Sequence, residues 1–248
     1  MRPTLMAQQQ PALRTSTGEF FQLIRVYYQV FNPKTVLGVF RKLRCMKFDR
    51  SRNRWVWLFE KEAKKLRFSM PYNQVPRQMR PLVIGAFFFR SDNQMHLDLR
   101  SSERTVAAIE FFDKHINRRA AKVTHLRIVN KLFESSQDNA QQLIKQSPDA
   151  FFERDDIARL GDDLTEKLEQ VKTEHQDFEV RQQMALDWIE QYAQSPLPEV
   201  EEMPANFYED GLDALEVSLN LRKLELIERW QGNQQANMLD IIKKLNIG

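Results

Sequence analysis

The sequence predicts an α+β fold, with a small antiparallel sheet and flanking helices in residues 18–133 and an elongated all-helical region in residues 148–248. Strand-like alternation of apolar residues is confined to the first region, whereas the second region carries apolar residues at helical spacing. The two parts also differ in charge. Residues 1–130 hold 25 Lys or Arg against 9 Asp or Glu, and residues 131–248 hold 12 against 25, which gives formal charges of +16 and −13.

Three stretches and their turns predict the sheet. Apolar and aromatic residues are concentrated in residues 54–59, 82–90 and 94–99, as is typical of buried or half-buried strands. Asp and Asn favour tight turns. We therefore predict that residues 49–53 and 91–93 connect two hairpins.

Spacing and caps assign the other elements of the first region. Residues 18–31 carry apolar side chains three and four apart and end before Pro33, which predicts a helix. Residues 35–43 are rich in β-forming residues and interrupted by Gly38, so we count them as a strand. The order α-β-β-β-β-α-β is completed by a helix over residues 103–116, capped by Ser101 or Ser102, and a strand over residues 122–133.

The second region is predicted to contain helices and no strand. Residues 1–17 are expected to be a disordered lead-in and residues 134–147 a linker. A helix start at Ser147-Pro148-Asp149 follows, because it combines a capping hydroxyl, a proline and an early acid. The further expectations are a long helix or helix pair from Ile157 to Phe178, a proline-rich acidic linker over residues 195–205, a helix over residues 209–230 and a last helix over residues 238–245.

Composition limits the compartment. Cys45 is the only cysteine, so an intrachain disulfide is excluded, and the first twenty residues lack the apolar core of a secretory signal. We therefore expect a reducing, cytoplasmic compartment. The most apolar stretch, residues 81–89, is far shorter than the roughly 20 residues of a membrane-spanning helix, so no transmembrane span is expected.

Few residues suggest chemistry, and we expect no enzyme, cofactor or metal. No two histidines have the i, i+4 spacing that aims two imidazoles at one metal, and no glycine-rich phosphate loop occurs. Basic neighbours of Cys45 would favour a reactive thiol, but buried packing is the preferred interpretation. His96 and Asp98 alternate and so share a strand face, which leaves a hydrolase-like enzyme as a third alternative.

A dense group of cations is the candidate site for an anionic partner. Five aromatic residues, Trp55, Trp57, Phe59, Phe68 and Tyr72, lie among these cations. Cations that neutralise phosphates and rings that stack on bases are typical of nucleic-acid surfaces. Alternation, however, favours the core for Trp55, Trp57 and Phe59. The candidate cations are Arg41, Lys42, Arg44, Lys47, Arg50, Arg52, Arg54, Lys61, Lys64, Lys65, Arg67, Arg77 and Arg80.

The leading hypothesis is a non-enzymatic binding or assembly protein. Its basic domain would engage an acidic partner, because a field of one sign attracts the opposite sign. RNA or DNA binding through residues 41–80 is the alternative, and docking of the two halves on each other, a homo-oligomer through the helical half and contact with an anionic membrane surface also stay open. The residues expected to make protein contacts in the helical half are Leu212, Leu215, Leu219, Leu226 and Trp230.

Overall fold

A large sheet forms the centre of the computed structural model, which describes residues 11–136, 147–159, 166, 169–170 and 178–245. The strands are β1 (Ile24–Val30), β2 (Met46–Asp49), β3 (Arg54–Leu58), β4 (Val83–Ser91), β5 (Gln94–Leu99), β6 (Ala121–Val129), β7 (Ala158–Arg159) and β8 (Val200–Pro204). They lie in the order β2-β3-β4-β5-β1-β6-β8-β7, and all neighbours are antiparallel except β7 and β8. Mixed helix and strand content is thus confirmed, but the expected small sheet is wrong.

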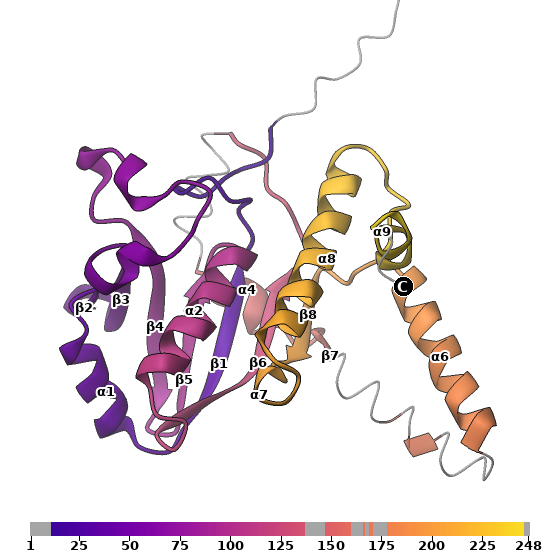
Figure 1. The fold of residues 1–248 in the computed structure, drawn as a ribbon, viewed down its shortest axis with the longest axis horizontal. Coiled ribbons are helices and arrows are strands. Elements are labelled where there is room, and N and C mark those ends of the chain that lie inside the picture. The colour runs from indigo at the N-terminus through magenta and orange to yellow at the C-terminus, as the bar shows by residue number, and fades with distance from the viewer. Residues whose placement is uncertain (1–10, 137–146, 160–165, 167–168, 171–177, 246–248) are drawn as a thin grey trace, which may run out of the picture.

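Helices cover both faces of this sheet to different extents. The helices are α1 (Pro33–Lys42), α2 (Ser102–His115), α4 (Asp149–Phe152), α6 (Phe178–Gln194), α7 (Phe207–Asp210), α8 (Leu212–Trp230) and α9 (Met238–Lys244). Residues of α1, α2 and α8 share one large apolar core with the sheet, and Figure 1 shows these helices in front of the strands. Phe152 of α4 packs in a separate cluster with Phe21, Leu23 and Val129.

The helix predicted over residues 18–31 is wrong, because this segment contains the central strand β1. The strand pairs with β5 on one side and β6 on the other. Ile24, Val26 and Tyr28 pack in the main core, and Arg25 and Tyr27 alternate with them. Phe20, Phe21 and Leu23 lie before the strand, and together with Tyr27 on its other face they produced a helical spacing by coincidence.

The strand predicted over residues 35–43 is also wrong, since it is helix α1. The Oδ1 atom of Asn32 accepts a hydrogen bond from the backbone N–H of Thr35 at 3.0 Å, and Pro33 occupies the first turn. Val36 and Phe40 are one turn apart and buried. The cap and this i, i+4 pair therefore outweigh the β propensity of the residues.

The second predicted hairpin and the helix after it are confirmed, whereas the first hairpin is confirmed only at its turn and second strand, because its first strand is β2 and not residues 35–43. Strand β4 pairs with β5 across the predicted turn, and β2 pairs with β3 across a 3₁₀ turn at Arg50–Arg52. Asn53 completes that turn with a φ of 47°, a left-handed conformation that Asn tolerates well. The Ser101 hydroxyl accepts the N–H of Arg104 and caps α2.

The C-terminal half is not all-helical in the described residues. Residues 200–204 lie within the stretch predicted as a proline-rich linker, yet they form β8 between β6 and β7. Pro204 is compatible with the strand because it is the last residue of β8. Helices α8 and α9 confirm the last two helices, and α4 confirms the helix start at Ser147, although Ile157 is not helical. Most of the predicted stripe between Ile157 and Phe178 lies outside the described residues.

A buried polar network fastens β8 to α8. Arg222 donates from Nε to Glu201 Oε1 at 2.5 Å and from Nη2 to Glu201 Oε2 at 3.1 Å. Glu201 is 0% exposed and Arg222 is 3% exposed. Asn130, which follows β6, and Tyr192 of α6 donate to the same carboxylate. These contacts connect β8, α8, α6 and the end of β6 through one ion pair.

Candidate anion-binding surface and the polar cluster beside it

The thirteen candidate cations gather at the β2 edge of the sheet. They lie on the end of α1, on the β2–β3 hairpin and on the following segment with 3₁₀ turns at Lys61–Lys65, Tyr72–Gln74 and Arg77–Met79. Eleven are exposed, while Arg54 and Arg80 are half-buried. Figure 1 shows this edge at the side of the molecule away from α6 and α9. We call this set the basic edge.

The basic edge has little internal neutralisation. Arg54 forms an ion pair with Asp49 at 3.0 Å, and within the described part of the chain no other member of the basic edge forms an ion pair. Arg80 donates instead to the backbone carbonyls of Val75 and Tyr72. Lys64 lies 4.6 Å from the centre of the Tyr72 ring. The charge of the basic edge is therefore directed mainly at solvent.

The aromatic residues of this segment belong mostly to the core. Trp57, Phe59 and Phe68 are buried, and Trp55 packs half-buried against the same core. Tyr72 is half-buried beneath Arg80 and Lys64. These rings are unavailable as a continuous platform for stacking bases.

The apolar residues expected to make protein contacts lie largely inside the chain. Leu215, Leu219 and Leu226 of α8 are buried, the first two in the main core. Leu212 and Trp230 are half-buried. Their assignment to an external partner is therefore wrong for the three buried leucines, because the sheet and the neighbouring helices already cover that face of α8.

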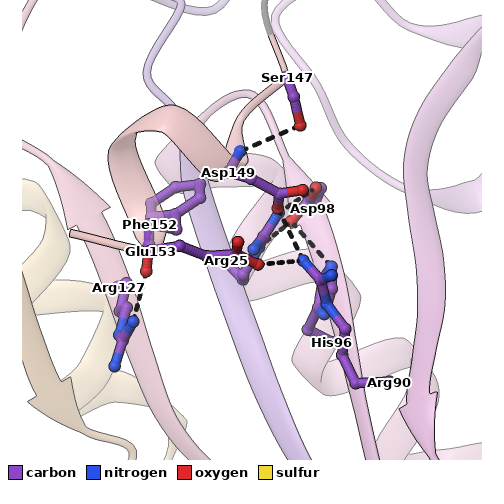
Figure 2. Close-up of polar contacts among 9 residues, drawn as sticks. All are labelled: Arg25, Arg90, His96, Asp98, Arg127, Ser147, Asp149, Phe152 and Glu153. Atoms are coloured by element: carbon purple, nitrogen blue, oxygen red, sulfur yellow. Dashed lines mark hydrogen bonds and ion pairs between the residues drawn. The ribbon is translucent and has the colours of Figure 1, made fainter.

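A cluster of ion pairs joins the two halves beneath α4 (Figure 2). Arg25 is 2% exposed and donates from Nε and Nη2 to the two carboxylate oxygens of Asp98, at 2.6 and 2.9 Å. Its Nη2 also donates to Asp149 at 2.7 Å, and its guanidinium lies over the Phe152 ring. Burial opposes the charge of Arg25, but Asp98 and Asp149 outweigh this effect and raise its pKa.

Two further arginines bind carboxylates of the C-terminal half. Arg90 pairs with Asp149 at 2.8 Å and with Glu153 at 2.5 Å. Arg127 pairs with Glu202 at 2.7 Å and also donates to the Phe152 carbonyl. The basic and acidic halves do meet, but the cations that they use lie outside the basic edge.

Replacing Asp149 with alanine should loosen α4 without unfolding the sheet. Arg25 keeps Asp98 and Arg90 keeps Glu153, but each loses its hydrogen bond to Asp149, so we expect the free energy of unfolding to fall by about 1–2 kcal/mol. Faster hydrogen exchange of the α4 amides would show the local effect. Asp155→Ala is the matched control, since Asp155 is exposed on the same segment. Equal losses from the two variants would contradict a clamp at Asp149.

His96 and Asp98 lie close together, but no hydrogen bond joins them as in a catalytic acid–base pair. His96 is 1% exposed and stacks on Phe88, and its Nε2 lies 3.8 Å from Asp98 Oδ1, beyond hydrogen-bond distance. Burial, followed by the charges of Arg25 and Arg90, lowers the pKa of His96 to about 3. Both oxygens of Asp98 accept from Arg25. The hydrolase-like alternative gains no support from this arrangement.

Cys45 is placed as a packing residue. It is 0% exposed, and burial, together with the charge of Glu62, raises the pKa of its thiol to about 12. Basic neighbours in the sequence had suggested the opposite direction. Burial dominates because the thiol lies inside the main core while the side chains of Arg41, Lys42, Arg44 and Lys47 are exposed.

Neither a metal site nor a membrane-spanning helix occurs among the described residues. No group of three or more His, Cys, Asp or Glu side chains there could hold a metal ion. No helix among the described residues is long and apolar enough to cross a membrane. Comparisons with protein-family models, curated proteins and solved structures found no match to this chain.

Sequence reasoning missed Arg25, Arg90 and Arg127 as interaction residues. Arg25 was hidden because its segment was predicted as a helix. An arginine that alternates with apolar residues in a central strand would have been a signal, since a buried arginine requires an acidic partner.

Proposed function

We propose that this chain is a non-enzymatic binding or assembly protein that engages an acidic protein partner through the basic edge. One observation supports the proposal most strongly. The carboxylates of Asp149, Glu153 and Glu202 pair with arginines elsewhere, so the cations of the basic edge keep an exposed and largely uncompensated charge. Such a field steers an acidic partner and binds it with strong dependence on salt.

The observations favour an acidic protein over nucleic acid. Binding of single strands combines phosphate contacts with exposed rings on which bases stack. Trp57, Phe59 and Phe68 are buried here, while Phe48 of β2 is exposed at 41%. Nucleic-acid binding stays the alternative outcome of the test below.

The helical half keeps its proposed role in protein contacts through different residues. Phe178 and Leu186 of α6 are 69% and 51% exposed, and Val217 of α8 is 47% exposed. We infer that exposed apolar side chains of α6 and α8 contribute to protein contacts.

The proposal is tested by titrating the full chain with poly-L-glutamate and, separately, with polyuridylate at several salt concentrations. We expect poly-L-glutamate to bind with an affinity that falls as salt rises. Replacing Arg44, Lys47 and Arg50 together with glutamine should weaken binding at low salt about tenfold or more, because three exposed cations without ion pairs are removed.

The matched control removes three exposed cations outside the basic edge. Arg119, Lys122 and Lys131 lie before, in and after β6 and form no ion pair within the described residues, and their replacement with glutamine changes the net charge equally. Equal weakening by both triple variants would sink the proposed surface. Tighter binding of polyuridylate, lost in the first variant only, would replace the acidic protein by nucleic acid.

A further inference from the structure

An arginine-lined cavity lies beside α4 and does not depend on the proposed function. Its volume is about 520 Å³, within the range of small-molecule sites. The walls come from β4, β5, the 3₁₀ turn after β2 and the segment that enters α4. Apolar lining is supplied by Phe21, Leu23, Val83, Ala86, Phe88 and Phe151.

Four arginines add positive charge to this apolar lining. Arg52, Arg54, Arg100 and Arg104 all line the cavity. Burial and the charge of Arg54 lower the pKa of Arg100, Asp98 opposes them, and Arg52 adds a smaller lowering, so Arg100 lies within electrostatic reach of both arginines and of Asp98. Its side chain still keeps an exposed surface. Within the described residues, Arg52 and Arg100 form no ion pair, whereas Arg54 pairs with Asp49.

Arg104 is held in the cavity wall by its own neighbours. This side chain is 2% exposed, its Nη2 donates to the Thr17 hydroxyl at 2.7 Å, and its Nε lies 3.6 Å from the Glu19 carboxylate. Arg104 therefore shapes the cavity, and the cations available to a ligand are Arg52 and Arg100.

The carboxylate on the cavity wall offsets this charge only in part. Asp98 lines the cavity, but both of its oxygens accept hydrogen bonds from Arg25. The Arg25–Asp98 pair is close to neutral as a unit. Arg54 pairs with Asp49 and Arg104 lies beside Glu19, so Arg52 and Arg100 give the cavity its positive charge.

We propose that this cavity binds a small amphiphilic anion, a molecule with one carboxylate or phosphate group and an apolar body. Arg52 and Arg100 bind the anionic group, because planar guanidinium groups donate in pairs to carboxylate and phosphate oxygens. The apolar body packs against Val83, Phe88 and Phe151. Transfer of the apolar body from water into the cavity is favourable and adds to the binding of the charged group.

Calorimetric titration of the full chain tests this site with four probes: octanoate, octyl phosphate, 1-octanol and inorganic phosphate. We expect one or both of the amphiphilic anions to bind with one site per chain. Binding of octanoate alone would identify a carboxylate ligand, and binding of octyl phosphate alone would identify a phosphate ester. Binding of both would show that the site recognises a negative charge attached to an alkyl group. Octanol and inorganic phosphate should each bind at least tenfold more weakly.

Two variants examine the two parts of the site. Arg100→Gln should weaken the anion about tenfold to a hundredfold, the usual effect of losing charge-assisted hydrogen bonds. Val83→Trp should also weaken it, because Val83 lines the cavity and is 46% exposed, so the larger ring can be accommodated without entering the core. Arg119→Gln removes the same charge from an exposed site elsewhere and should bind normally.

Three results would overturn the site: no binding of either amphiphilic anion, equal binding of octanol, or equal weakening by Arg100→Gln and Arg119→Gln. The surface variant of Arg44, Lys47 and Arg50 should leave octanoate and octyl phosphate binding unchanged, because none of the three lines the cavity. Failure of this site and failure of the basic edge are therefore separate results.

Discussion

Replacing Arg222 with methionine should lower the free energy of unfolding by about 3–5 kcal/mol, as is usual when one partner of a buried ion pair is removed. Glu201, at 0% exposure, would keep its buried negative charge without the guanidinium that binds both of its oxygens. Asn130 and Tyr192 still donate to Glu201, but neither carries a positive charge. Urea unfolding followed by circular dichroism measures the change.

A double variant separates charge from packing. Glu201→Leu combined with Arg222→Met should recover part of the loss, because an apolar pair leaves no uncompensated charge. Arg118→Met is the control, since Arg118 and Asp113 form a more exposed pair whose loss should change the stability little. A loss at Arg222 no larger than that of the control, or a double variant less stable than Arg222→Met, would contradict a stabilising role of the buried charge pair.

His96→Phe should remove a large part of the acid sensitivity of the fold. The pKa of His96 is lowered from 6.5 to about 3 in the folded chain, so between these values the unfolded chain binds the proton that the folded chain excludes. The stability contribution is therefore complete above pH 6.5 and is lost as the pH falls. The expected slope is about 1.4 kcal/mol per pH unit, or about 2 kcal/mol between pH 6.5 and pH 5.

Urea unfolding of the wild type and the variant at several pH values measures this slope. The phenylalanine ring keeps the aromatic contact with Phe88 but cannot titrate. Phe88→Leu is the control, because it disturbs the same packing and retains the imidazole, so its stability should fall at every pH while the slope persists. Identical slopes in the wild type and His96→Phe would show that His96 is not the acid-sensitive group.

The elements that could be predicted are those specified by residues close together in the sequence. The hairpin of β4 and β5 is marked by turn residues, and α2 by the Ser101 cap, so neighbouring residues contain the necessary information. Strand β1 and strand β8 depend on partners far along the chain. Their pairing with β5 and β6 decides their conformation, and single-sequence spacing does not carry that contact.

The candidate site also has a part that the sequence predicts and a part that depends on tertiary contacts. The sequence identified every cation of the basic edge, because charge can be counted. It could not identify which arginines the acidic half neutralises, since Arg25, Arg90 and Arg127 reach Asp149, Glu153 and Glu202 only after the sheet is assembled. The cavity near Arg100 likewise joins residues from separate elements.

The sequence by itself determined the opposite charges of the two halves, the single cysteine and the local hairpins, because composition and turn chemistry do not require tertiary contacts. Only the tertiary structure decided that β8 of the acidic half joins the sheet and that the basic edge stays largely unpaired. The physical reason is that ion pairs and strand ladders are short-range interactions between distant residues. Which charges remain exposed for a partner is therefore fixed by packing.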